Sequence, residues 1–219
     1  KKTKYMVVNT GREKEEEINE EVKAGKVTKT DEYKYVGFNV DTKGDCQHHI
    51  EKKSSKLPGQ IEALKSMASY SNVGSSFVNV RLNMYEMCII PSVLHALEAW
   101  NKITKKEIMT LEQQQAKALC SLLHLPRTTP YLALLNEVGI CRIKERLECK
   151  KALLLQNILV SDDRRLVKRI LEEQKENEEE DTFYMESKKI MQMYNININE
   201  VTEMTNDKLK EVLKEKVKE

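Results

Sequence analysis

Cysteine and histidine residues form two clusters that could hold a metal ion. Cys46 lies just before His48 and His49, and Cys120 lies four residues before His124, which would place both on one face of a helix. Structural zinc needs four ligands, arranged as closely spaced pairs. Neither cluster supplies four, so we expect no metal site and no cofactor in this chain.

Carboxylates offer a second kind of chemistry. Asp162 and Asp163 form the only Asp-Asp pair in the chain. They lie between two expected helices, where an aspartate side chain accepts hydrogen bonds from the first free amides of a helix. We therefore interpret them as capping residues. The sequence contains no Ser-His-Asp arrangement and no glycine-rich phosphate loop above chance.

A third candidate combines aromatic residues with a nearby group of lysines. Residues 32–41 are rich in aromatic and β-branched side chains, which predicts a strand. Gly37 interrupts this run and indicates either a bulge or a close approach to the backbone. Lys52, Lys53 and Lys56 follow at the start of a helical region. They could contact phosphates, a contact that positions nucleic acid without reading its sequence, or they could form a solvated helix start.

The chain changes from β to α structure near residues 41–44. A short apolar strand at residues 4–9 is expected to pair antiparallel with a second β stretch at residues 27–40. Two strands alone are marginally stable in water, so we expect them to need a further sheet. The intervening charged segment is expected to be a solvated loop.

Apolar residues at three- and four-residue spacing predict helices along the rest of the chain. Pro58 fits a first helical turn, Ser75 can cap the second helix, Thr104 and Glu107 form a capping box, and Gly139 fits a helix C-terminus. The expected helices cover residues 58–70, 75–90, 93–100, 104–125, 130–138, 143–160, 164–174, 183–194 and 207–218.

Composition sets broad limits. The 219 residues carry a net charge of +2, with a small basic excess in residues 1–150 and an acidic excess in residues 151–219. Such a distribution is compatible with nucleic-acid contact. The five cysteines are odd in number and scattered, which predicts free thiols in a reducing, intracellular compartment. There is no signal peptide or apolar segment long enough to span a bilayer, so no membrane association is expected. The chain begins without methionine, and we expect it to be a piece of something larger.

Several motifs, in order over residues 1–160, resemble the reverse transcriptases of non-LTR (LINE-type) retrotransposons. Residues 2–6 (KTKYM) are similar to a palm strand of the form Lys-Thr/Ser-x-x-Met, and residues 33–38 (YKYVGF) to the primer-grip hairpin, with Val36 where leucine is usual. The remaining matches follow the thumb and the segment after it: residues 61–71, Gly74, 81–82, 90–94, 98–100, 122–126, Pro130 and 137–140.

This resemblance implies a fold and a division of the chain. The fold class would be mainly α with a small N-terminal antiparallel β element, the end of a polymerase palm followed by a helical thumb bundle and further helices. The implied divisions are residues 1–44 (last palm strands and primer-grip hairpin), 45–126 (helical thumb), 127–160 (post-thumb helices) and 161–219 (charged helical tail).

The resemblance also implies roles for individual residues. Tyr35, Val36, Gly37 and Phe38 would hold the primer end, with Gly37 admitting nucleic-acid backbone, or would form an ordinary bulge. Lys2 would approach the phosphates of the incoming nucleotide as a general acid in the intact enzyme, or would be a solvated terminal lysine. Lys52, Lys53 and Lys56 would precede a thumb helix.

The departure from the family concerns catalysis. Two Mg²⁺ ions held by palm aspartates, one of them in an aromatic-x-Asp-Asp turn, carry out nucleotidyl transfer in such enzymes. That turn would lie upstream of Lys2, so the chain should be inactive by itself, and Mg²⁺ belongs to the intact polymerase.

The expected function is that of a C-terminal fragment of an RNA-directed DNA polymerase that grips the primer–template duplex during target-primed reverse transcription. The implied partners are an RNA template, a DNA primer and the missing fingers and palm of the same polymerase. The parent element would act in the nucleus and cytoplasm. The alternative is a non-enzymatic helical module, derived from such an element, that binds nucleic acid or protein.

Overall fold

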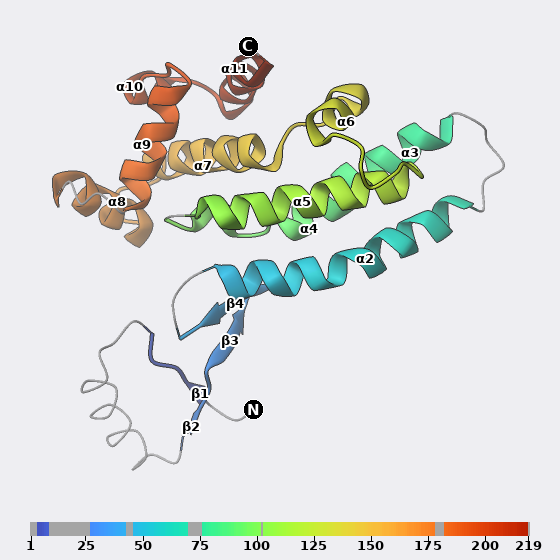
Figure 1. Ribbon diagram of the computed structural model, residues 1–219. Helices are drawn as coiled ribbons and strands as arrows, with labels where there is room; N and C mark the ends of the chain where they lie inside the picture. Colours follow the sequence, from blue (N-terminus) through green and yellow to red (C-terminus); the bar gives the residue numbers. More distant parts are fainter. Residues whose placement is uncertain are drawn as a thin grey trace. The chain divides into compact units, whose positions relative to one another are not determined.

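The computed structural model describes residues 4–8, 27–42, 46–69, 76–101, 103–177 and 182–218. The chain divides into two compact units, residues 1–56 (unit 1) and residues 57–219 (unit 2). Within the described residues the fold is mainly helical, and the strands belong to unit 1 (Figure 1). This confirms the predicted class, mainly α with a small antiparallel β element. Lys2, the charged segment 10–26, Gly74 and the cap predicted at Ser75 lie outside the described residues.

Unit 1 contains short strands that pair in two separate ways. They are β1 (Lys4–Tyr5), β2 (Thr28–Lys29), β3 (Glu32–Tyr35) and β4 (Phe38–Asp41). β1 pairs with β2 in parallel, so the antiparallel pairing predicted for the first strand is wrong. The physical reason is that the second β stretch folds back on itself, and the antiparallel partner of β3 is β4.

The turn between β3 and β4 consists of two residues. Tyr35 pairs with Phe38, and the intervening Val36 and Gly37 have φ angles of 46° and 88°. Positive φ at both central residues defines the type I′ turn, whose twist matches that of the strands it joins. Of the two interpretations of Gly37, the bulge is therefore wrong, because this glycine reverses the chain. Val36 is unusual here, since β-branched residues rarely adopt this conformation.

The helices follow one another with short connections. Their bounds are α2 (Gln47–Ser69), α3 (Ser76–Met84), α4 (Ile90–Val93), α5 (Lys105–Leu122), α6 (Tyr131–Val138), α7 (Ile143–Leu159), α8 (Leu166–Asn177), α9 (Phe183–Met193), α10 (Ile198–Glu203) and α11 (Asn206–Lys218). A π-helical turn, Tyr85–Ile89, joins α3 to α4, and a 3₁₀ turn, Leu97–Ala99, follows α4.

Local signals fixed several of these ends as predicted. The Glu107 carboxylate accepts a hydrogen bond from the Thr104 N–H at 2.6 Å, and the Thr104 hydroxyl accepts one from the Glu107 N–H at 3.3 Å. Gly139 ends α6 in the left-handed conformation, with a φ angle of 66°. Both caps depend only on residues within one turn, which is why the sequence reveals them.

Other predicted boundaries are wrong. α2 begins at Gln47, and Pro58 lies in its interior and not in its first turn. Pro58 is exposed, so water can hydrate the carbonyl that proline leaves without a helical donor. The helix predicted over residues 93–100 does not form, because α4 ends at Val93 and the chain turns at Ala96, whose φ angle is 63°. This turn allows both Leu94 and Leu97 to be completely buried.

Two further boundaries in the C-terminal part differ from the prediction. α6 begins at Tyr131, and Pro130, expected to be its first residue, is its N-cap residue. The short helix α10 is not among the expected helices, and Asn197 is its N-cap residue. Its side-chain oxygen accepts a hydrogen bond from the Asn199 N–H at 3.1 Å.

Helix α7 is the centre of unit 2. Ile143, Leu147, Ala152, Leu155 and Ile158 are all buried, so apolar residues occupy more than one of its faces. α5, α8, α9, α10 and α11 all contact it (Figure 1). A helix that is apolar on several faces requires cover on each of them.

The strained turn gives a first prediction. Replacing Val36 with Asn should stabilise the hairpin by about 1 kcal/mol, because asparagine tolerates a positive φ that costs valine conformational energy. Native-state hydrogen exchange of the β3 and β4 amides measures this change. Val40→Asn, a substitution of the same type at an extended strand position, is the control and should not stabilise. Slower exchange in Val40→Asn than in Val36→Asn would contradict the account of the turn.

Candidate nucleic-acid interface

The hairpin is anchored to the first turns of α2 by Phe38 and Asn39. The Phe38 ring stacks on His49, with ring centroids 4.1 Å apart and an interplanar angle of 21°. The Asn39 backbone N–H donates to Nδ1 of His49 at 3.1 Å. Phe38, Asn39, His49 and Ile50 are buried. Unit 1 therefore has a small core of its own, which fixes the hairpin on residues 47–56 of α2.

The tip of the hairpin projects into solvent. Tyr35 is 66% exposed and Val36 is 74% exposed, whereas Phe38 is 7% exposed. Of the residues expected to hold a nucleic-acid end, Tyr35 and Val36 present their side chains and Gly37 provides the turn. The Phe38 side chain is buried instead, where it stacks on His49 of α2.

The lysines predicted to contact phosphates have different surroundings. Lys52 forms an ion pair with Glu32, and the same carboxylate lies 3.1 Å from Nε2 of His48. The positive charge of Lys52 is therefore already paired with a carboxylate. Lys56 is exposed and Lys53 is half-buried.

Lys53 belongs to a cluster of positive charges. Burial lowers the pKa of Lys53 from its ordinary value, and the positive charges of Lys34 on β3 and Lys56 on α2 lower it further. A pKa lowered in this way means that the folded chain disfavours the Lys53 charge. An anion beside these lysines would remove that cost. We call Lys34, Lys53 and Lys56 the lysine cluster.

Lys34 is a candidate that sequence reasoning missed. It lies in the YKYVGF run, but only its cross-strand pairing with Asn39 places it beside the first turns of α2. Because the strand turns back at Val36, residues of β3 approach lysines some twenty positions later in the chain. No periodic signal in the sequence reports such a contact.

The residues considered for metal binding have other roles. Cys46 is buried, His48 lies against Glu32, and His49 stacks on Phe38. Within the described ranges, no group of three or more His, Cys, Asp or Glu residues could hold a metal ion.

The aspartate pair lies in the turn that precedes α8. The helix predicted from residue 164 begins at Leu166, so the predicted capping role is wrong, and the carboxylate of Asp162 closes a turn instead. Oδ1 of Asp162 accepts a hydrogen bond from the Arg164 N–H at 2.9 Å. Asp163 forms an ion pair with Lys168.

The cysteines carry free thiols, as predicted. Burial, reinforced by neighbouring acidic groups, raises the pKa of Cys149 to about 11. This thiol is therefore protonated at neutral pH and is a poor nucleophile.

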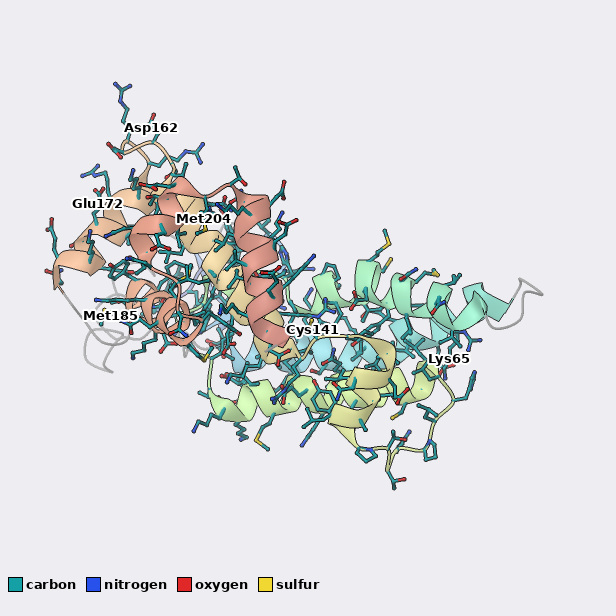
Figure 2. The ribbon with its side chains drawn as sticks, turned by 90° about the horizontal axis from the view of Figure 1, so that it is seen from above. Lys65, Cys141, Asp162, Glu172, Met185 and Met204 are labelled. Atoms are coloured by element: carbon teal, nitrogen blue, oxygen red, sulfur yellow. The ribbon has the colours of Figure 1, made fainter. Side chains whose placement is uncertain are left out.

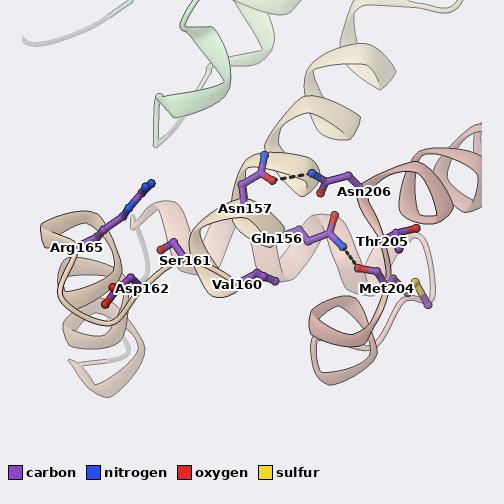
Figure 3. A pocket seen from close by; sticks show the side chains of 9 residues that line it. All are labelled: Gln156, Asn157, Val160, Ser161, Asp162, Arg165, Met204, Thr205 and Asn206. Atoms are coloured by element: carbon purple, nitrogen blue, oxygen red, sulfur yellow. Dashed lines mark hydrogen bonds between the residues drawn. The ribbon is translucent and has the colours of Figure 1, made fainter.

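An open cavity of about 530 Å³ lies at the C-terminal end of α7 (Figure 3). Gln156 forms its floor, 1% exposed, and its Nε2 donates to the carbonyls of Val201 at 2.9 Å and Met204 at 2.7 Å. Above it, Asn206 donates to Asn157 at 3.0 Å. The Gln156 bonds hold the segment between α10 and α11 against α7, whereas the Asn157–Asn206 bond is exposed to solvent. We therefore assign Gln156 a structural role.

None of the helices in the described part of the chain combines the length and the apolar composition needed to cross a membrane. No family model, curated protein or solved structure matches this chain.

The Gln156 bridge gives a second prediction. Gln156→Leu keeps the size of the side chain but leaves two carbonyls without their donor, and should lower the free energy of unfolding by about 2 kcal/mol. Urea denaturation measures this loss. The control is Asn157→Ala on the exposed side of the same turn, which should cost little. A loss in Asn157→Ala as large as that in Gln156→Leu would contradict the bridging role.

The lysine cluster gives a third prediction. Lys53→Met keeps the apolar stem but removes the disfavoured charge, and should stabilise the hairpin at neutral pH by a few tenths of a kcal/mol, on the order expected for partly exposed charges. Since the folded-state pKa lies below that of the unfolded chain, wild-type stability rises as the pH increases from the lowered pKa toward 10.5.

The difference between Lys53→Met and wild type should therefore shrink at alkaline pH. Hydrogen exchange of the β3 and β4 amides across this pH range measures it. Lys208→Met, at an exposed position of α11, is the control and should leave the hairpin unchanged. A constant difference at all pH values would exclude the charge as its cause.

Proposed function

We propose that unit 1 grips the sugar–phosphate backbone of a nucleic-acid duplex, and that the chain is the C-terminal part of an RNA-directed DNA polymerase of the non-LTR retrotransposon type. The observation that carries this proposal is the lysine cluster beside the exposed hairpin tip. The order of motifs along residues 1–160 supports the assignment to this class of polymerase.

The lysine cluster suits a phosphate ligand for two reasons. Its charges repel one another in the folded chain, as the lowered pKa of Lys53 indicates. A phosphate between them would offset this repulsion and raise the pKa of Lys53. Lysine binds phosphate as a point charge and without reading bases, which fits a grip that must slide along any sequence.

The hairpin tip is suited to contact the end of a nucleic-acid strand. Tyr35 presents an aromatic ring and Val36 an aliphatic side chain to solvent. Aromatic rings stack on bases or sugars whatever the sequence. The tight turn at Gly37 places the backbone at the outermost point of the hairpin, where a nucleic-acid strand can approach closely.

The chemistry of polymerisation would have to come from outside this chain. The described residues do not fit a two-metal site, because Asp162 accepts a hydrogen bond in the turn before α8 and Asp163 is paired with Lys168. Residues of the missing palm would hold Mg²⁺ in the intact polymerase, and this chain would position the duplex.

The alternative is a non-enzymatic module that binds nucleic acid through the same cluster. The two differ in what lies upstream in the reading frame. An aromatic-x-Asp-Asp turn preceding residue 1 would favour the polymerase, and a start codon immediately before residue 1 would favour the module.

The fourth prediction tests the grip directly. The full chain should bind an RNA–DNA hybrid duplex with an affinity that falls steeply with salt and depends little on sequence. The double variant K34A/K53A should bind more weakly and should reduce the slope of log K against log salt by about 1.8, or ~0.9 per lost phosphate contact. Fluorescence anisotropy at several salt concentrations measures both effects.

The matched control is K208A/K214A, which removes two exposed lysines from α11. It should leave the salt dependence unchanged. A folded chain that binds no duplex at low salt would overturn the proposal, as would an equal loss of slope in both double variants.

A further inference from the structure

A row of aliphatic side chains is exposed on α8 and at Val160, the residue before the connection from α7 to α8. Val160 is 63% exposed, Leu166 68%, Val167 55% and Ile170 43%. Leu171, four positions after Val167, is buried in the core formed with α7 and α9. Leu166 lies on a different side of the helix from Leu171 and is the most exposed of the row. A large part of these aliphatic side chains is therefore not covered by the chain itself.

The charges of α8 are segregated along its length. Arg164 and Arg165 immediately precede the helix, and Lys168 and Arg169 lie in its N-terminal half. Glu172, Glu173 and Glu176, with the single basic residue Lys175, occupy the C-terminal half. Figure 2 shows Glu172 at the outer edge of the helical unit. Within the described part of the chain, none of the ion pairs or side-chain hydrogen bonds includes the side chain of any of these three arginines and three glutamates.

The order of these charges does not serve the helix itself. Acidic residues near the N-terminus and basic residues near the C-terminus stabilise a helix through its dipole, and α8 has mainly the reverse order. Arg169 and Glu173 share the outward face with Leu166 and Ile170, since positions three and four apart lie on one side of a helix. The outward face thus has an aliphatic centre, a basic end and an acidic end.

We propose that α8 is a homodimer interface, in which two copies of the chain pack their α8 helices antiparallel about a two-fold axis near Ile170. In this arrangement the arginines of each copy face the glutamates of the other, and the aliphatic residues meet at the centre. A two-fold interface must be self-complementary, and the charge order of α8 is self-complementary only in the antiparallel sense.

The charge pattern favours a second copy over other occupants. An anionic lipid surface or a nucleic-acid backbone would attract the arginines but would meet three glutamates on the same short helix. Neither would cover Leu166 and Ile170 while satisfying both ends. A second copy covers the aliphatic centre and pairs both charged ends.

The test is the oligomeric state of the full chain, measured by sedimentation equilibrium over a range of protein concentrations. Wild type should show a monomer–dimer equilibrium, and L166E/I170E should remain monomeric at every concentration. Both positions are exposed, so the variant should retain the wild-type circular dichroism. Leu132→Glu, at a 57% exposed position of α6, is the matched control and should dimerise like wild type.

Charge exchange tests the antiparallel arrangement. R165E/R169E has an acidic α8 and E173R/E176R has a basic α8, so neither should self-associate. Mixed together, they should form a heterodimer, because each half of one helix then faces the opposite charge. The quadruple variant that combines all four changes should again form a homodimer.

Weak specific dimers form at concentrations on the order of several hundred micromolar. A wild-type chain that stays monomeric up to this concentration would overturn the proposal. So would self-association unaffected by L166E/I170E, or a failure of the two charge variants to associate when mixed. A monomer that binds phosphatidylserine vesicles or duplex through the arginines would assign the face to that ligand instead.

Discussion

The constraint on which unit 2 depends is the burial of α7. Its apolar residues point in several directions, so no single neighbour can cover them. α5, α8, α9, α10 and α11 each cover part of this surface. Polar bonds fix where these neighbours sit. Arg142 at the start of α7 donates two hydrogen bonds to Glu112 on α5, at 3.0 and 3.1 Å. At the other end Gln156 holds the segment before α11.

The constraint in unit 1 is different, because a small hairpin has to be stabilised there. Two strands gain little from their own hydrogen bonds in water, and this hairpin gains its core from Phe38 and His49. The sequence-based expectation was that a further sheet would be required. A helix supplies the cover instead, and the same helix brings Lys53 and Lys56 to the side of Lys34.

The features that suit unit 1 to bind a phosphate backbone also lower its stability. Burial, together with the like charges of Lys34 and Lys56, lowers the pKa of Lys53, which means that its charge disfavours the folded state at neutral pH. The strained Val36 at the tip acts in the same direction. Proteins retain such features at sites where a ligand offsets them, and a phosphate backbone would do so here.

The sequence alone determined the features that depend on neighbours within one helical turn. The capping box at Thr104 and the left-handed end at Gly139 could be predicted, as could the start of α9 and the position of α11, because each rests on contacts between residues three or four apart. The tertiary structure decided the rest. It determined the parallel pairing of β1, the turn at Ala96, the burial of Phe38 and the place of Lys34 among the lysines. These features depend on residues far apart in the chain, and their energies come from burial and from charge, neither of which a local pattern specifies.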